Sequence, residues 1–267
     1  MSLTFSDLMG SICSGDSNNN GLAWSVDIPD NWMQGRTTYG GLSAALCLQT
    51  ALLDNPDLPP IRSAQINFIG PAGGKVQMQS KILRQGKSVC YIEVLMFGEK
   101  GLATHAVFCF GAARQSKLND AYTSKPDVPD HHYLPEFFPP GTAPSFTRNF
   151  ETKLAIGDPP ISASTKNEFY LWCRHSDKTA NSMTALLGIA DMPPPAVLPK
   201  FKEFAPISSM TWMLNFLVDE PQTQDGWWLL RSGAEHAVDG YSSQDMQVWN
   251  SNKELVISGL QNIAIFY

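Results

Sequence analysis

The segment Tyr39–Leu53, YGGLSAALCLQTALL, determines how the first half of this chain can fold. Alanine and leucine dominate the segment, and both are strong helix formers. Two glycines precede the apolar run and Asn55-Pro56 follow it, a pattern typical of the two ends of a helix. Because apolar residues cover nearly the whole circumference, the sequence predicts a helix that is buried on most sides.

Runs rich in β-branched and aromatic residues, or alternating polar with apolar residues, surround this helix. Short turn signals such as Gly98-Glu99-Lys100-Gly101 separate the later runs. Consecutive strands joined by tight turns pair antiparallel, so one strand, the helix and then four strands of one antiparallel sheet are expected. The predicted strands are Leu22–Ile28, Ser63–Ile69, Val76–Leu83, Val89–Phe97 and Leu102–Phe110.

The second half repeats this order of elements after a stretch of different composition. Residues 113–145 hold six prolines among many polar residues, which is typical of a linker that runs over the surface. A strand then leads into a second helix, predicted near Ala180–Asp191 and ended by three prolines. The chain is therefore divided into residues 1–112, a linker of residues 113–145, and residues 146–267. The predicted strands of the second half are Phe169–Arg174, Ile207–Leu217, Trp227–Glu235, Tyr241–Trp249 and Leu255–Tyr267.

Composition excludes several classes of protein. A chain of 267 residues with 43% hydrophobic residues can bury the cores of two small domains. Its formal net charge is −6 and it has no Lys/Arg cluster, so nucleic acid is not an expected partner. It has no apolar run long enough to span a membrane and no signal peptide at residues 1–13. Five cysteines without CxxC spacing favour reduced thiols in a cytoplasmic protein.

One amide interrupts an apolar face of the last predicted strand. Side chains alternate between the two faces of a strand, so Gln261 shares its face with Leu255, Ile257, Gly259, Ile263 and Ile265. A buried amide without a partner costs roughly 1–3 kcal/mol. Gln261 should therefore hold a water or a specific partner, unless a backbone group satisfies it or that face is simply an apolar outer face.

A carboxylate continues the apolar stripe of the second helix. Met183, Leu186, Leu187 and Ala190 form the stripe, and Asp191 follows Leu187 by one helical turn. Carboxylates are rarely fully buried unless they are paired. Either Asp191 is buried with a partner, or the helix has ended before the prolines and the side chain is solvated.

The repeat relates these two polar residues to each other. Aligning the two halves places Asp191 on Ala51 and Gln261 on Phe108. One half thus has a polar pair where the other has apolar core residues. A duplicated domain that kept a single active site would show this pattern.

These segments together resemble a known enzyme family. The helix start Y39-G-G-L-S-A-A-L, the hairpin R84-Q-G-K-S88, and the segments L186-L-G-I-A-D191 and L255-V-I-S-G-L-Q261 are similar, in order and spacing, to double-hotdog acyl-CoA thioesterases of the bacterial thioesterase II type. The resemblance covers residues 20–112 and 168–267. It implies an α+β fold of two tandem hotdog domains, each a long helix wrapped by an antiparallel sheet, the two sheets forming one continuous double hotdog.

The resemblance also implies an activity, the hydrolysis of acyl-CoA thioesters to free acid and CoA in fatty acid metabolism. Asp191 and Gln261 would hold and polarise the attacking water. The family adds a Thr hydroxyl on the strand after the second helix, where an alignment on Trp212 places Pro206 in this chain. Either another residue of that strand supplies the hydroxyl, Ser208, Ser209 or Thr211, or the network lacks it.

The substrate would contact further residues of the first half. Gly40 and Gly41 open the first helix, whose unpaired N–H groups suit a developing oxyanion. Arg62, Arg84 and Lys87 are candidates for the CoA phosphates, although each can equally be a solvated surface charge. No cofactor and no metal is expected, since the five histidines are scattered. A homodimer is the expected assembly, with acyl-CoA as substrate and no membrane partner.

Three other interpretations remain open on the sequence. Gly41-Leu42-Ser43-Ala44-Ala45 is close to a nucleophile elbow, and the order Ser43, Asp191, His236 is that of α/β-hydrolases, but such a fold needs a parallel sheet. A hotdog dehydratase needs an Asp/His pair that the spacing does not show. A non-catalytic acyl-CoA-binding hotdog protein would share the fold.

Overall fold

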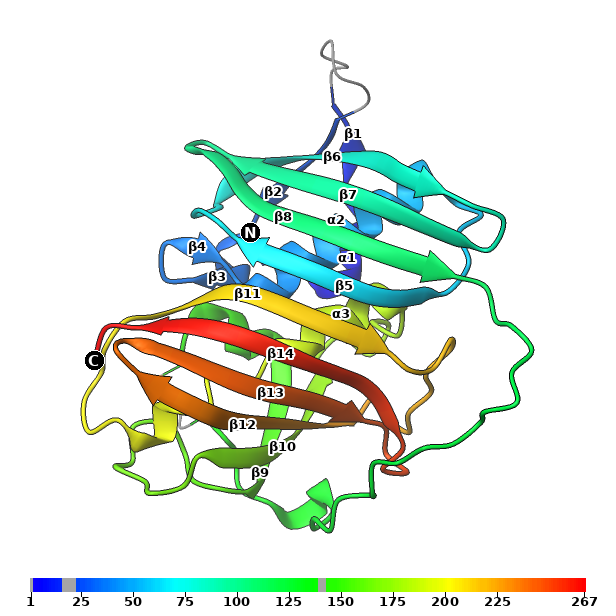
Figure 1. Ribbon diagram of the computed structural model, residues 1–267. Coiled ribbons are helices and arrows are strands. Elements are labelled where there is room, and N and C mark those ends of the chain that lie inside the picture. The colour runs from blue at the N-terminus through cyan, green and yellow to red at the C-terminus, as the bar shows by residue number, and fades with distance from the viewer. Residues whose placement is uncertain (1, 16–22, 139–142) are drawn as a thin grey trace.

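The computed structural model describes residues 2–15, 23–138 and 143–267 of the chain (Figure 1). The first half forms α1 (Phe5–Gly10), β1 (Cys13–Ser14), β2 (Trp24–Ile28), η1 (Asp30–Trp32), β3 (Met33–Gln34), β4 (Thr37–Thr38), α2 (Gly40–Asp54), β5 (Ile61–Phe68), β6 (Gly74–Gln85), β7 (Val89–Gly98) and β8 (Gly101–Gly111). The second half forms η3 (Ser145–Asn149), β9 (Phe150–Ile156), β10 (Glu168–His175), α3 (Met183–Ala190), η4 (Leu198–Lys200), β11 (Ile207–Phe216), β12 (Trp228–Val238), β13 (Tyr241–Trp249) and β14 (Leu255–Ile265). Between them lies η2 (His131–Tyr133).

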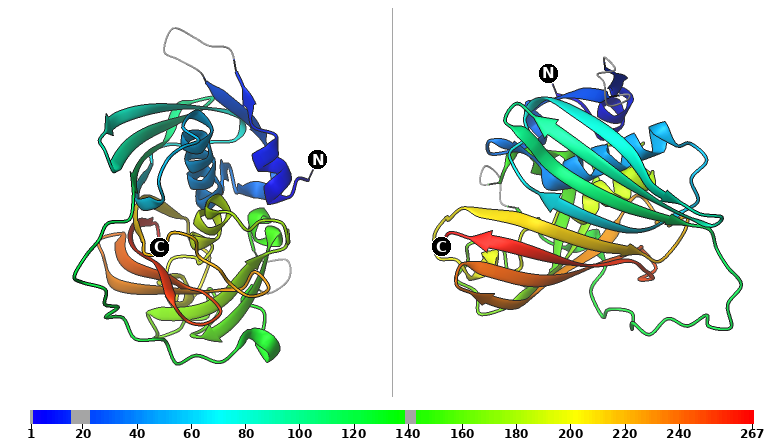
Figure 2. Two further views of the ribbon diagram at one scale, coloured as in Figure 1. Left: turned by 90° about the vertical axis from the view of Figure 1, so that its right-hand side faces the viewer. Right: turned by 45° about the horizontal axis from the view of Figure 1, so that its top comes forward.

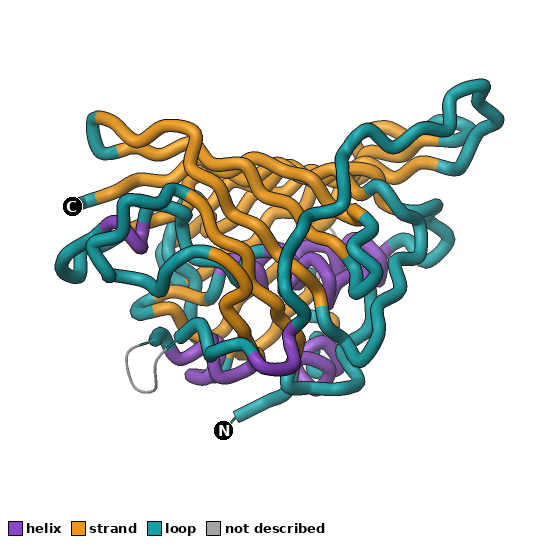
Figure 3. The backbone as a smooth tube through the Cα atoms, turned by 90° about the horizontal axis from the view of Figure 1, so that it is seen from below, coloured by secondary structure: helices purple, strands orange, loops and turns teal. Residues whose placement is uncertain are grey.

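One continuous sheet runs through both halves. Within the described residues it has twelve strands in the order β1-β2-β6-β7-β8-β5-β11-β14-β13-β12-β10-β9. The halves join where β5 pairs antiparallel with β11, in a register that sets Ile66 opposite Trp212. The sheet curves around α2 and α3, which lie on one side of it (Figures 2 and 3).

The two helices meet at small residues. A Cβ on Gly41 of α2 would lie 2.3 Å from the carbonyl oxygen of Gly188 in α3, so only glycine allows this approach. The Tyr39 hydroxyl donates a hydrogen bond of 2.7 Å to the same carbonyl. This crossing sets the N-terminus of α2 against the C-terminus of α3.

Segments at the start of each half pack on the other half. Phe5 of α1 lies beside His175 of β10, with ring centroids 4.9 Å apart, and the Ser6 N–H donates to Asp177. In the opposite direction, Phe146 of η3 stacks on Tyr39 with centroids 4.2 Å apart. The two halves therefore share one hydrophobic core.

The predicted elements can now be compared with the observed ones. The long first helix, the shorter second helix and every predicted strand have a counterpart, although Leu22, the expected start of the first strand, lies outside the described residues. The helix α1, the strand β9 and the two-residue strands β1, β3 and β4 were not predicted from the sequence. The linker runs along one side of the molecule, and Val128 and Phe137 within it are buried (Figure 1). Residues 139–142 of the linker lie outside the described part. No helix in the described chain is long and apolar enough to cross a membrane.

Candidate active site

Asp191 lies at the C-terminal end of α3. The Ser182 hydroxyl caps the start of this helix, and the helix ends at Ala190 so that Asp191 is its C-cap. The helix has thus ended, as one of the two sequence interpretations held, yet the carboxylate is only partly exposed. It turns toward the N-terminus of α2 and the inner face of the sheet. Of the two alternatives for Asp191, the geometry therefore favours a side chain that has partners over one that is solvated.

Gln261 supplies the first of these partners. It lies on the inner face of β14 with 4% of its surface exposed. Its Nε2 donates hydrogen bonds of 2.9 Å to Asp191 Oδ1 and 3.1 Å to Ser209 Oγ. Its Oε1 accepts a bond of 2.8 Å from Nε2 of Gln244 on β13. Side chains, not backbone groups, satisfy this amide on both sides.

The hydroxyl of the cluster belongs to Ser209 of β11. Pro206, which the alignment on Trp212 placed at the family's Thr position, lies exposed before the strand and offers no hydroxyl, whereas Ser209 on the strand itself does. A register shift between Ser209 and Thr211 interrupts the ladder with β14. Thr211 and Ser208 are exposed, and the hydroxyl that bonds to Gln261 is that of Ser209, so the structure does not bring either of them into the cluster.

The N-terminus of α2 completes the surroundings of the carboxylate. The N-cap residue Tyr39 makes no side-chain capping bond. The backbone N–H of Gly41 instead lies close enough to Asp191 of the other half to lower the pKa of that carboxyl group. A Cβ on Gly40 would lie 2.6 Å from Asp191 Oδ2, so the carboxylate rests directly on the helix end. The predicted oxyanion donors and the predicted base are thus brought together at the start of α2.

Burial and hydrogen bonding act against each other on this carboxyl group. Desolvation raises the pKa of Asp191 from 3.8 to about 7, while the hydrogen bonds from Gln261 and Gly41 oppose the rise. A carboxyl group with a pKa near neutrality can take up and release a proton under physiological conditions. The corresponding residues of the first half, Ala51 and Phe108, are fully buried and offer no such group.

Comparison with protein families identifies the chain. A family model described as the acyl-CoA thioesterase C-terminal domain matches residues 125–265, and one described as the N-terminal domain of the same enzymes matches residues 28–111. The chain belongs to the acyl-CoA thioesterase family. It is a thioester hydrolase, which confirms the resemblance on which the predicted activity rested. Among curated proteins none matches the chain significantly.

Solved structures show the same fold across the whole chain. A conserved hotdog-fold protein from Alicyclobacillus acidocaldarius is 21% identical with a TM-score of 0.87, covering 99% of each chain. A protein described as a thioesterase II from Thermobifida fusca is 17% identical with a TM-score of 0.80, covering 100% of this chain and 99% of its own. An acyl-CoA thioesterase II from Mycobacterium marinum is 15% identical with a TM-score of 0.76, covering 98% of each chain. The predicted double-hotdog fold is confirmed.

The alternative with a serine nucleophile is wrong for this thioesterase. Ser43 lies within α2, is buried, and directs its hydroxyl at the Tyr39 carbonyl oxygen 3.4 Å away. His236 is exposed near the end of β12. Every strand pair in the described residues is antiparallel, so the parallel sheet that carries a nucleophile elbow is not formed here.

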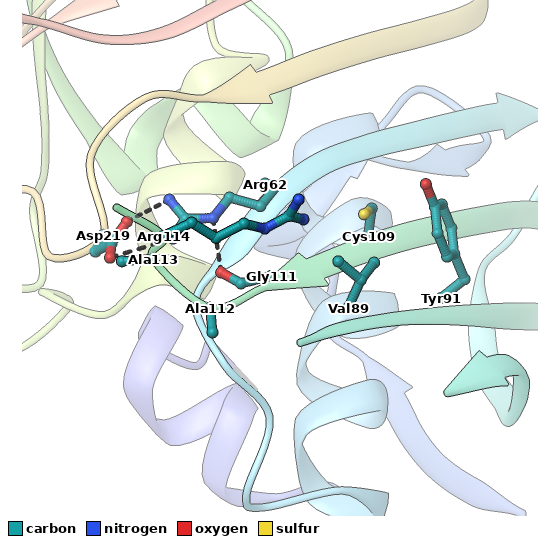
Figure 4. A pocket seen from close by; sticks show the side chains of 9 residues that line it. All are labelled: Arg62, Val89, Tyr91, Cys109, Gly111, Ala112, Ala113, Arg114 and Asp219. Atoms are coloured by element: carbon teal, nitrogen blue, oxygen red, sulfur yellow. Dashed lines mark hydrogen bonds and ion pairs between the residues drawn. The ribbon is translucent and has the colours of Figure 1, made fainter. Parts of the chain in front are cut away.

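The three basic residues predicted to bind CoA phosphates lie away from Asp191. Arg62 is the second residue of β5, and Phe68, which adjoins Gly40, is the last. About 20 Å of strand therefore separates Arg62 from the end of β5 that lies near Asp191. Arg62 forms an ion pair with Asp219 and donates to the Gly111 carbonyl oxygen at the rim of a surface pocket (Figure 4). Arg84 and Lys87 are exposed at the β6–β7 turn, at the same end of the sheet. The structure does not bring these groups into the cluster.

One group in the described residues has the composition of a metal site. Oxygen and nitrogen atoms of Asp130, His131 and His132 lie within 4.8 Å of one another. The His132 imidazole hydrogen-bonds to the Asp130 carboxylate, and Nδ1 of His131 lies 2.7 Å from the same carboxylate. The group lies on the linker, where His131 packs against Trp227. It is not part of the cluster around Asp191.

Proposed function

We propose that this thioesterase hydrolyses acyl-CoA with a water activated by Asp191, Gln261 and Ser209. The observation that supports the proposal is the position of the Gln261 amide, which donates to both Asp191 Oδ1 and Ser209 Oγ. This arrangement combines a base, a fixed amide and a hydroxyl at the end of a helix. Thioester hydrolysis needs a base and donors for an oxyanion, and both can be assigned here.

The proton transfers follow from the hydrogen bonds. Ser209 accepts from Gln261, so its own O–H is left to donate to the oxygen of the water. Asp191 accepts a proton from that water as the oxygen attacks the thioester carbon. The tetrahedral intermediate then breaks at its C–S bond, and the proton held by Asp191 passes to the leaving thiolate. The products are the free acid and the CoA thiol.

The oxyanion is assigned to the N-terminus of α2. Because the Gly41 N–H lies beside Asp191 and lowers the pKa of its carboxyl group, we assign this role to the neighbouring N–H of Gly40, the first helical residue. The helix dipole and the unpaired N–H groups at the N-terminus of a helix both favour a negative charge there. The base thus comes from the second half and the oxyanion donor from the first.

Turnover of an acyl-CoA panel tests this proposal. Free-thiol release from acetyl- to palmitoyl-CoA would be measured for the wild type, Asp191→Asn and Gln261→Ala. Loss of a general base lowers turnover by roughly 10²- to 10⁴-fold. Asp27→Asn is the matched control, because Asp27 is an exposed carboxylate on β2. Full activity in Asp191→Asn would overturn the assignment.

A cytoplasmic location and a homodimer remain predictions from the sequence.

A further inference from the structure

Gln244 is a buried polar residue that the proposed mechanism does not use. It lies on the inner face of β13, opposite Gln261 of β14 in the strand register, and is fully buried. Its Nε2 donates to Gln261 Oε1 at 2.8 Å, and its Oε1 accepts from the Ala196 backbone N–H at 2.8 Å. Ala196 follows Asp191 in the segment that leads from α3 to η4. These bonds close a ring from Asp191 through its own chain to Gln244, Gln261 and back to Asp191.

A primary amide can be placed in two orientations that differ only in which end donates. For Gln261 the difference matters, because only its NH₂ group can donate to both Asp191 and Ser209. In the reversed orientation the amide oxygen would face the carboxylate. The Ala196 N–H is a backbone donor that cannot reverse. It fixes Gln244 Oε1 as an acceptor, so Nε2 of Gln244 must donate, and Gln261 Oε1 must accept.

We infer that Gln244 is a positioning residue, which holds the Gln261 amide in its productive orientation by passing on the fixed polarity of the Ala196 N–H. The inference rests on the proposed function and extends it to a residue that touches neither water nor substrate. Its effect is greatest after Asp191 has taken the proton from water. Protonated Asp191 no longer selects the NH₂ end of Gln261, because a carboxylic acid can donate as well as accept. Gln244 then remains to prevent reversal before the proton passes to the leaving group.

Two substitutions of Gln244 alter its hydrogen bonds in different ways. Gln244→Glu keeps an acceptor for the Ala196 N–H but presents a carboxylate to Gln261, which favours the reversed amide. Gln244→Met removes both bonds at similar volume. Gln247→Glu is the matched control, since Gln247 lies on the outer face of the same strand near Arg231. Circular dichroism and thermal melting of each variant establish that it is folded.

The expected result is a fall in kcat of roughly ten-fold or more for both Gln244 variants, with KM nearly unchanged and Gln247→Glu like the wild type. A loosened strand would alter KM as well. The decisive measurement is a double-mutant cycle with Gln261→Ala on a single acyl-CoA. If Gln244 acts through Gln261, then Gln244→Met should cost almost nothing further in the Gln261→Ala background.

Two outcomes overturn the inference and are distinguishable from failure of the proposed function. Full activity of folded Gln244→Met, with Gln261→Ala impaired, removes the role of Gln244 and leaves the mechanism intact. Additive losses in the cycle show that Gln244 does not act through Gln261. If Asp191→Asn and Gln261→Ala both keep wild-type turnover, the proposed mechanism itself has failed.

Discussion

Burial outweighs hydrogen bonding in setting the pKa of Asp191. Burial raises its pKa to about 7 against the hydrogen bonds from Gln261 and Gly41. Because the base must be ionised to accept a proton, kcat/KM should rise with pH and level off above about 7. Gln261→Leu removes a bond that lowers the pKa, so the midpoint should move to higher pH. Profiles of both proteins from about pH 5 to about pH 9 check this; an unmoved midpoint would contradict it.

The same shift makes Asp191 a pH-dependent cost to stability. Its pKa is higher in the folded chain than the ordinary 3.8, so the folded chain binds the proton more tightly. The associated stability is fully present below pH 3.8 and is lost as the pH rises through about 7. Asparagine does not titrate, so Asp191→Asn lacks this pH dependence. The free energy of unfolding of Asp191→Asn, taken relative to that of the wild type, should therefore increase by about 1–3 kcal/mol from acidic to alkaline pH. Urea unfolding at several pH values measures the difference, and a constant gap would refute the linkage.

Single residues differed in how well the sequence predicted them. Asp191 and Gln261 were visible because each interrupts an apolar pattern. Ser209 could not be distinguished from its neighbours, because the register shift before Thr211 breaks the alternation that assigns faces. Gln244 lies on a strand with polar residues on both faces, Ser242 on its own and Gln247 on the other, so its burial left no mark in the pattern.

At the scale of elements, the two glycines of α2 have separate roles. The Cβ of Gly41→Ala would meet the backbone carbonyl of Gly188 at 2.3 Å, and backbone cannot easily yield. The Cβ of Gly40→Ala would instead meet the end of the Asp191 side chain at 2.6 Å, which can move. Gly41→Ala should therefore lower stability by about 1–3 kcal/mol or more. Gly40→Ala should lower turnover at nearly unchanged melting temperature. Equal effects of the two substitutions on both properties would contradict this separation.

Elements with strong periodicity were predicted, and short or weakly patterned ones were not. The long apolar helix and the strands of the hairpins follow from repeated local signals. By contrast, β9 alternates only weakly and follows soon after the proline-rich linker, so it was not predicted as a strand of the second half. The six-residue α1 is too short to show a helical period, and its burial depends on contacts with the distant β10.

The molecule as a whole should unfold as one unit, because its core draws on both halves. The order of the predicted elements indicated the repeat. It did not indicate that α1 and η3 each pack on the opposite half, because such contacts produce no periodic pattern in the sequence. Phe5 tests this cooperativity: it belongs to the first half, is 2% exposed, and packs on His175 of the second. Phe5→Ala should cost about 3–5 kcal/mol and shift a single melting transition of both halves downward.

Phe204→Ala is the matched control for that experiment, since Phe204 is 80% exposed and should leave the transition unchanged. Calorimetry would be combined with tryptophan fluorescence, because Trp32 and Trp212 report on different halves and are both buried. Coincident transitions in Phe5→Ala would support one cooperative unit. A first half that melts ahead of the second would show that the shared core is not sufficient to couple them. In that case the N-terminus of α2 at Gly40 would unfold while Asp191 was still held in the folded second half, because the two residues come from different halves.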